Sequence, residues 1–227
     1  MRKYLRQTLL TVLCMALLAT PLFAGKVNKR AKKALERLKM YEIEYNTESF
    51  FHYVDKGNFE VVQSFLDAGF DPNTVDKLGY RALIIAAEKN DVRMITTLRK
   101  GGADVNLGDT DCTTPLMYAA YYRNKQAIVQ LMKEKANVNI QNKAGMTALM
   151  FAIIGGDIQC IEAVMTADTD LTLRNTMNLT AVGVARTKEY IEVANYIKNR
   201  MDYLQYKHIP EKKELEINIK KGQAPKE

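Results

Sequence analysis

Short apolar runs alternate with polar turns along the chain, and the pattern is clearest in residues 109–142. Thr114 is placed to accept a hydrogen bond from a free backbone N–H of a first helical turn, and Pro115 at the first helical position gives up no hydrogen bond. Small residues at 119–120 let a neighbouring helix approach closely, and the apolar residues of 127–132 give a second helix a buried face. The segment therefore predicts two helices joined by a tight turn.

This two-helix pattern recurs at a fixed interval of 33 residues. The threonine that begins the first helix is present as Thr114, Thr147 and Thr180. The small residue five places later recurs as Ala86, Ala119, Ala152 and Ala185. A strict period of this length predicts a solenoid in which each repeat packs mainly on its neighbours.

The repeat resembles the ankyrin repeat. The family's Thr-Pro-Leu is present at 114–116, its alanine pair at 119–120 and its Gly-Ala-Asp-Val-Asn at 102–106. The resemblance covers roughly residues 43–200. It implies an all-α ankyrin repeat solenoid of helix-turn-helix units with short hairpin-like turns. It also implies that the protein works by binding another protein.

Three features depart from the family pattern. The histidine that often follows Thr-Pro-Leu is absent from every copy, so we do not expect the hydrogen bonds that it makes between neighbouring repeats. Arg81 stands in place of a capping threonine and no proline follows it, which should cost that helix about 1 kcal/mol. Cys112 and Asn178 replace the turn glycine; asparagine tolerates a left-handed backbone, and cysteine does so less well.

The flanks of the repeats are also patterned. In residues 25–45, apolar side chains at three- and four-residue intervals predict an N-terminal capping helix, and they are Ala31, Ala34, Leu35, Leu38 and Tyr41. Residues 46–200 form the predicted ankyrin repeat domain of five repeats. Residues 201–227 are a charged C-terminal tail whose end has the composition of a disordered segment.

Residues 1–24 have the features of a secretory signal peptide. The basic residues Arg2, Lys3 and Arg6 precede an apolar run about a dozen residues long, and Ala24 is the preferred cleavage point. The run is shorter than the roughly 20 residues of a membrane span. We therefore expect export to the periplasm or the outside of the cell, with an uncleaved membrane anchor as the alternative. The leader and the repeats together resemble exported bacterial ankyrin repeat-containing proteins.

Charge and chemistry exclude several classes of function. The formal charge of +7 falls to +4 when the three basic residues of the leader are removed, which argues against a nucleic-acid partner. His52, His208, Cys112 and Cys160 are isolated in the sequence, whereas a catalytic or zinc site needs clustered groups. We expect no enzyme activity, no cofactor, no metal and no small-molecule substrate.

The resemblance implies a concave groove lined by the turn tips and the outer side of each first helix. Large apolar side chains at these positions have no packing role if they face solvent, so they mark a binding surface. The candidate partner-binding residues are Leu78, Tyr80, Tyr121, Tyr122, Met146, Ile154 and Met177. The alternative is that some of them fold back onto adjacent repeats as ordinary packing.

The sequence thus favours a non-enzymatic protein–protein interaction module of the cell envelope or secreted fraction, monomeric, which binds its partner through the concave groove. The alternative is a structural or assembly partner of an exported enzyme. No residue of the sequence selects that alternative or names the partner. A membrane contact is expected only where the N-terminal segment stays uncleaved.

Overall fold

The computed structural model describes residues 24–166 and 168–207, and these ranges hold eleven α-helices and no strand. The predicted leader, apart from Ala24, and the tail beyond Lys207 lie outside the described residues. The helices are α2 (Ala24–Met40), α3 (Thr47–Asp55), α4 (Phe59–Asp67), α5 (Ala82–Glu88), α6 (Val92–Lys100), α7 (Pro115–Tyr121), α8 (Lys125–Lys133), α9 (Ala148–Gly155), α10 (Ile158–Val164), α11 (Ala181–Thr187) and α12 (Ile191–Lys207).

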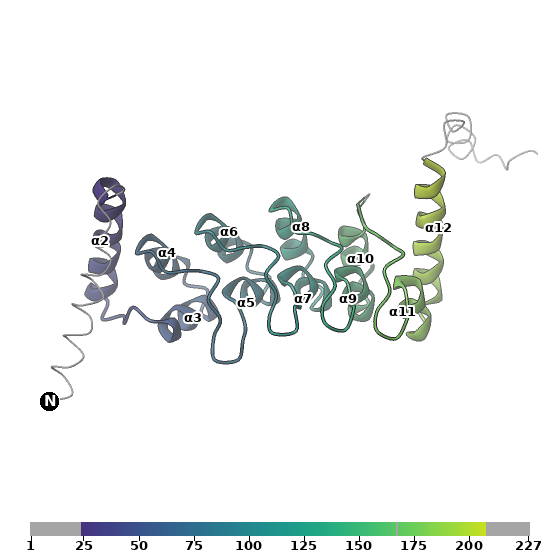
Figure 1. The fold of residues 1–227 in the computed structure, drawn as a ribbon, viewed down its shortest axis with the longest axis horizontal. Coiled ribbons are helices and arrows are strands. Elements are labelled where there is room, and N and C mark those ends of the chain that lie inside the picture. The colour runs from purple at the N-terminus through teal and green to yellow at the C-terminus, as the bar shows by residue number, and fades with distance from the viewer. Residues whose placement is uncertain (1–23, 167, 208–227) are drawn as a thin grey trace, which may run out of the picture.

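The helices are arranged in two rows along the long axis of the molecule (Figure 1). The first helices of the repeats, α3, α5, α7, α9 and α11, each pack against the next, and so do the second helices from α4 to α10. The loops that precede the first helices project on one side of the molecule (Figure 1). The predicted all-α solenoid of helix pairs is confirmed.

Threonine caps begin the later first helices, as the sequence predicts. The hydroxyls of Thr114, Thr147 and Thr180 each accept a hydrogen bond of 3.4 Å from the backbone N–H three residues on. Arg81 makes no such cap. Its guanidinium donates instead to the carbonyl oxygen of Gly108 at 2.8 Å and to that of Asn73, so it ties the second repeat to the loop of the third.

Each projecting loop is held by one Asp or Asn side chain at the repeat interval. Its Oδ1 accepts hydrogen bonds from the backbone N–H groups two and four residues on, and the four residues are Asp76, Asp109, Asn142 and Asn175. The loop then needs a left-handed residue, which is Gly79, Cys112, Gly145 or Asn178. Cys112 has φ 62°, so the expected left-handed backbone at this cysteine is confirmed.

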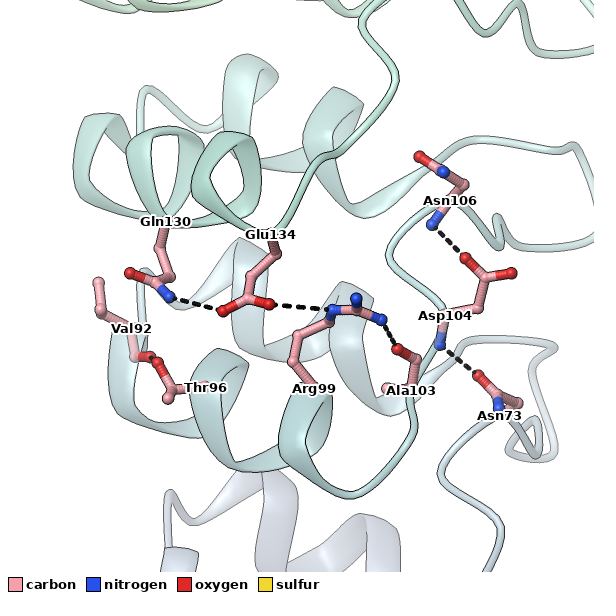
Figure 2. A network of polar contacts seen from close by, with 9 residues as sticks. All are labelled: Asn73, Val92, Thr96, Arg99, Ala103, Asp104, Asn106, Gln130 and Glu134. Atoms are coloured by element: carbon pink, nitrogen blue, oxygen red, sulfur yellow. Dashed lines mark hydrogen bonds and ion pairs between the residues drawn. The ribbon is translucent and has the colours of Figure 1, made fainter.

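A ladder of asparagines joins successive repeats at the base of these loops (Figure 2). Oδ1 of Asn73 accepts from the backbone N–H of Asp104 at 2.8 Å, and Asn106 does the same for Asn137 and Asn139 for Asp170. The three asparagines are half-buried and the bonds are exposed to solvent, so each contributes about 1 kcal/mol at most. They take over part of the inter-repeat bonding for which the family often uses histidine.

The second helices are also linked by polar contacts. In Figure 2, Nε of Arg99 on α6 lies 3.5 Å from a carboxylate oxygen of Glu134, which follows α8. Gln130 donates to the other carboxylate oxygen at 3.1 Å, and Arg99 also donates to the carbonyl oxygen of Ala103. Since Arg99 and Glu134 are both about three-quarters buried, this network fixes the spacing of two repeats.

The N-terminal helix α2 packs against α4 and so covers the first repeat. Ala34 and Leu38 of α2 are buried, as the stripe of apolar residues predicts. A cluster of aromatic rings lies under this end of the core, with Phe50 stacked on Phe70 at 4.3 Å between ring centroids. At the other end α12 packs against α11 and continues past residue 200 to Lys207.

Within the described ranges, no helix combines the length and the apolar character that crossing a bilayer requires.

Candidate interaction surface

The structure places four of the predicted partner-binding residues in solvent. Leu78 and Met177, at the tips of two loops, are 77% and 70% exposed. Tyr121 and Tyr122, at the end of α7 in the middle repeat, are each 45% exposed. These residues belong to the first-helix face, by which we mean the exposed side of the first helices together with the loops that precede them.

Two further candidates are half-buried, and a third is almost completely buried. Tyr80 and Ile154 are half-buried. Met146 is only 9% exposed, and its sulfur accepts a hydrogen bond from Nδ2 of Asn175 at 3.3 Å. The expectation that Met146 faces solvent is wrong, because the loop of the fifth repeat covers it.

Five aromatic rings form an unbroken series of contacts on the first-helix face, which we call the aromatic stripe. The centroid distances are 6.0 Å for Tyr80–Tyr118, 6.4 Å for Tyr118–Tyr122, 5.2 Å for Tyr122–Tyr121 and 6.2 Å for Tyr121–Phe151. These distances lie within the range of attractive aromatic pairs. The stripe begins in the loop before α5, crosses α7 and ends on α9, so it spans three repeats.

Tyr118 anchors the stripe. Its hydroxyl donates a hydrogen bond of 2.8 Å to Oδ2 of Asp109, the residue that holds the loop before α7. Burial and this hydrogen bond raise the pKa of Tyr118 well above its ordinary value. Tyr122 also has a raised pKa, through burial first and then through the charge of Glu88. Both phenols therefore stay neutral at physiological pH.

A family model described as ankyrin repeats (3 copies) matches residues 50–142 and 123–206 of the chain. These two matches together cover more than half of the sequence. The chain belongs to the ankyrin repeat family. Ankyrin repeats generally mediate protein–protein interaction, and proteins built from them are typically interaction modules without enzyme activity. No curated protein matches this chain.

Sequence reasoning missed Tyr118 and Phe151, two of the five rings in the stripe. They lie 33 residues apart, at the position that Ile85 and Val184 occupy in other ankyrin repeats of this chain. This is a packing position, and both rings are indeed half-buried. One feature of the sequence could have identified them. Two successive repeats carry an aromatic residue at this position, and Tyr118 also lies close in sequence to Tyr121 and Tyr122.

A glycine brings the third and fourth ankyrin repeats together under the stripe. A Cβ at Gly155 would lie 2.9 Å from the carbonyl oxygen of Tyr121 and 3.0 Å from that of Ala120. These distances are too short for any side chain, so only glycine permits this approach of α9 to the end of α7. The close approach places Phe151 beside Tyr121.

Exposed ion pairs between ankyrin repeats border the first-helix face. Nζ of Lys89 lies 2.6 Å from a carboxylate oxygen of Asp55, and Lys77 pairs with Glu48 at 3.1 Å. The hydrogen bond from Lys89 lowers the pKa of Asp55. Exposed pairs of this kind contribute little to stability.

The described residues also include two cysteines and an open cavity away from the stripe. No group of three His, Cys, Asp or Glu side chains within these residues could hold a metal ion. Cys112 is exposed and Cys160 is buried, and both are free thiols. Burial raises the pKa of the Cys160 thiol to about 11, so it stays protonated. An open cavity of about 790 Å³ between α2 and α4 lies outside the aromatic stripe.

Proposed function

We propose that this ankyrin repeat protein is an exported, non-enzymatic module that binds a partner protein through the first-helix face, where the family resemblance places the concave groove. It acts in the cell envelope or the secreted fraction of a bacterium. The residues that carry binding are Leu78, Tyr80, Tyr121, Tyr122, Ile154 and Met177, together with Tyr118 and Phe151, which complete the aromatic stripe.

The observation that carries this proposal is the aromatic stripe. A folded protein gains no packing from leaving large rings exposed, yet Tyr121 and Tyr122 are each nearly half exposed in the middle repeat. Tyrosine is enriched among the residues that dominate binding energy, because it buries a large apolar area and still offers a hydroxyl. A central position in the interface is where a partner excludes water best.

Support for export comes from the sequence of residues 1–24, with its basic start and short apolar run. N-terminal sequencing of the protein recovered from fractionated cells tests it. An N-terminus at or near Gly25 in the periplasmic or secreted fraction supports export with cleavage. A protein that begins at Met1 and fractionates with the cytoplasm contradicts it, and one that begins at Met1 in the membrane fraction indicates the anchored form.

Affinity capture from the compartment where the protein is found tests the interaction. The wild-type protein and a variant with Tyr121→Ala and Tyr122→Ala serve as baits side by side. We expect a stoichiometric protein that the wild type retains and the variant does not. An exported enzyme as that protein indicates the assembly role, whereas equal retention by both baits contradicts the proposed surface.

A further inference from the structure

The positive charge of this protein is concentrated in one helix. Residues 25–40 carry seven basic residues and one acidic residue, a net charge of +6. Residues 41–227 carry 23 basic and 25 acidic residues, a net charge of −2. Apart from the leader, the excess of positive charge therefore lies in α2 alone.

The structure shows how α2 presents this charge. Its inner face, with Ala34 and Leu38, is buried against the first repeat. Six basic side chains of α2 are exposed, and they are Lys29, Arg30, Lys32, Lys33, Arg37 and Lys39. Arg37 also reaches α4, where its guanidinium donates a hydrogen bond of 3.3 Å to the hydroxyl of Ser64. Of these six, only Arg30 forms an ion pair within the part of the chain that the structure describes, with Asp67 at 2.7 Å. The face therefore keeps most of its charge available for a partner.

Two exposed apolar side chains lie at the C-terminal end of the same helix. Met40 is 69% exposed and Tyr41 is 60% exposed. A basic helical face that ends in a tyrosine and another large apolar side chain has the composition of a segment that lies at a membrane–water interface. In the sequence, α2 also follows directly on the apolar residues of the leader.

We propose that the exposed basic face of α2 docks on an anionic phospholipid surface. Charge complementarity with lipid phosphates supplies the attraction, and Met40 with Tyr41 inserts at the level of the headgroups. An anionic bilayer fits this face better than an acidic protein does, because the lysines lie on successive turns without a defined pocket between them. The contact holds the protein at a membrane even after cleavage of the leader.

The position of α2 is compatible with partner binding. Figure 1 shows α2 at one end of the solenoid, beside α4 and apart from α5, α7 and α9. The aromatic stripe lies on these three first helices and the loop before α5, so a membrane on the outer side of α2 leaves it accessible. The inference is independent of the proposed function, since it involves different residues and a different partner.

Vesicle sedimentation tests the proposal, with the protein purified from the cells that make it and whichever N-terminus it then carries. Vesicles of phosphatidylcholine are compared with vesicles that also contain phosphatidylglycerol. We expect preferential binding to the anionic vesicles that weakens as salt screens the charges. Lys29→Glu, Lys32→Glu and Lys33→Glu together should weaken it by at least roughly tenfold.

A matched control changes the same amount of charge elsewhere. Lys100→Glu, Lys133→Glu and Lys198→Glu alter three exposed lysines of α6, α8 and α12, and this variant should keep the anionic preference. The proposal is overturned if both triple variants lose vesicle binding equally. It is also overturned if the wild type binds equally well to vesicles with and without phosphatidylglycerol. Binding of duplex DNA that depends on Lys29, Lys32 and Lys33, without vesicle binding, also overturns it and assigns the face to nucleic acid.

Discussion

The hydroxyl of Tyr118 donates a hydrogen bond of 2.8 Å to Oδ2 of Asp109, while Oδ1 of the same carboxylate holds the loop before α7. One acidic side chain thus fixes both the turn and the second ring of the aromatic stripe, Tyr118. The loop tips and the rings of the first-helix face are therefore parts of one preorganised surface, which limits the entropy lost when a partner binds.

Tyr118→Phe tests this hydrogen bond through its pH dependence. The change should destabilise the protein by about 1 kcal/mol at about pH 8, because it leaves the carboxylate with one bond fewer. The raised pKa of Tyr118 means that the folded state keeps the proton to higher pH than the unfolded state. The protonated phenol stabilises the folded state fully at pH values below about 10, the pKa of tyrosine in the unfolded chain. This stabilisation is lost as the pH rises from there towards the higher pKa of the folded state.

Urea unfolding of wild type and Tyr118→Phe at about pH 8 and about pH 11 gives the measurement. The difference in unfolding free energy between the two proteins should narrow at the higher pH. A difference that stays constant or grows means that the phenol is not protected from ionisation in the folded state.

Cys112→Gly should stabilise the protein. Cys112 adopts φ 62°, a left-handed conformation that costs an ordinary residue about 1–2 kcal/mol and glycine almost nothing. After the entropy that glycine loses on folding, we expect a gain of up to about 1 kcal/mol in unfolding free energy, measured under reducing conditions. Cys112→Val is the control and should lose stability, since a β-branched residue fits this conformation poorly. If both variants are less stable than the wild type, the left-handed backbone at Cys112 is not a source of strain.

Asn106→Ala tests the ladder between repeats. Oδ1 of Asn106 accepts from the backbone N–H of Asn137 at 2.8 Å, and alanine leaves that donor without this partner. We expect a loss of about 1 kcal/mol in unfolding free energy from urea titration, because the bond is exposed and water can replace the lost acceptor. Asn106→Asp retains an acceptor oxygen at the same place and should cost clearly less. If both substitutions lower the unfolding free energy by the same amount, the bond from Asn137 to Asn106 does not stabilise the fold through its acceptor oxygen.

The repeat register could be predicted from the sequence because its causes are local. Thr114 acts on a backbone group three residues on, and Cys112 stands at a turn position of the repeat, so their spacing alone indicates a cap and a turn. The same reasoning correctly anticipated that Arg81 makes no cap. It could not show that Arg81 instead bonds to Asn73 and Gly108, since that contact depends on how two repeats pack.

The candidate binding surface could be predicted only in part, because it also depends on how neighbouring repeats pack. Met146 and Tyr80 occupy equivalent positions in different repeats, yet Met146 is covered by Asn175 and Tyr80 is half-buried beside Tyr118. Burial of a side chain at a repeat boundary depends on which side chains the next repeat places against it. A single repeat pattern does not contain that information, so Tyr118 and Phe151 were not among the candidate residues.

The most direct test of the central claim is the affinity of the captured partner protein for wild type and two matched double variants. Tyr121→Ala with Tyr122→Ala truncates the exposed rings of the stripe. Val129→Ala with Ile158→Ala truncates two comparably exposed apolar residues on the second-helix side. Both variants should remain folded by circular dichroism. The tyrosine variant should lose about 2 kcal/mol or more of binding free energy, and the control should bind as wild type does. Equal affinities for all three proteins would contradict the claim that the aromatic stripe binds the partner.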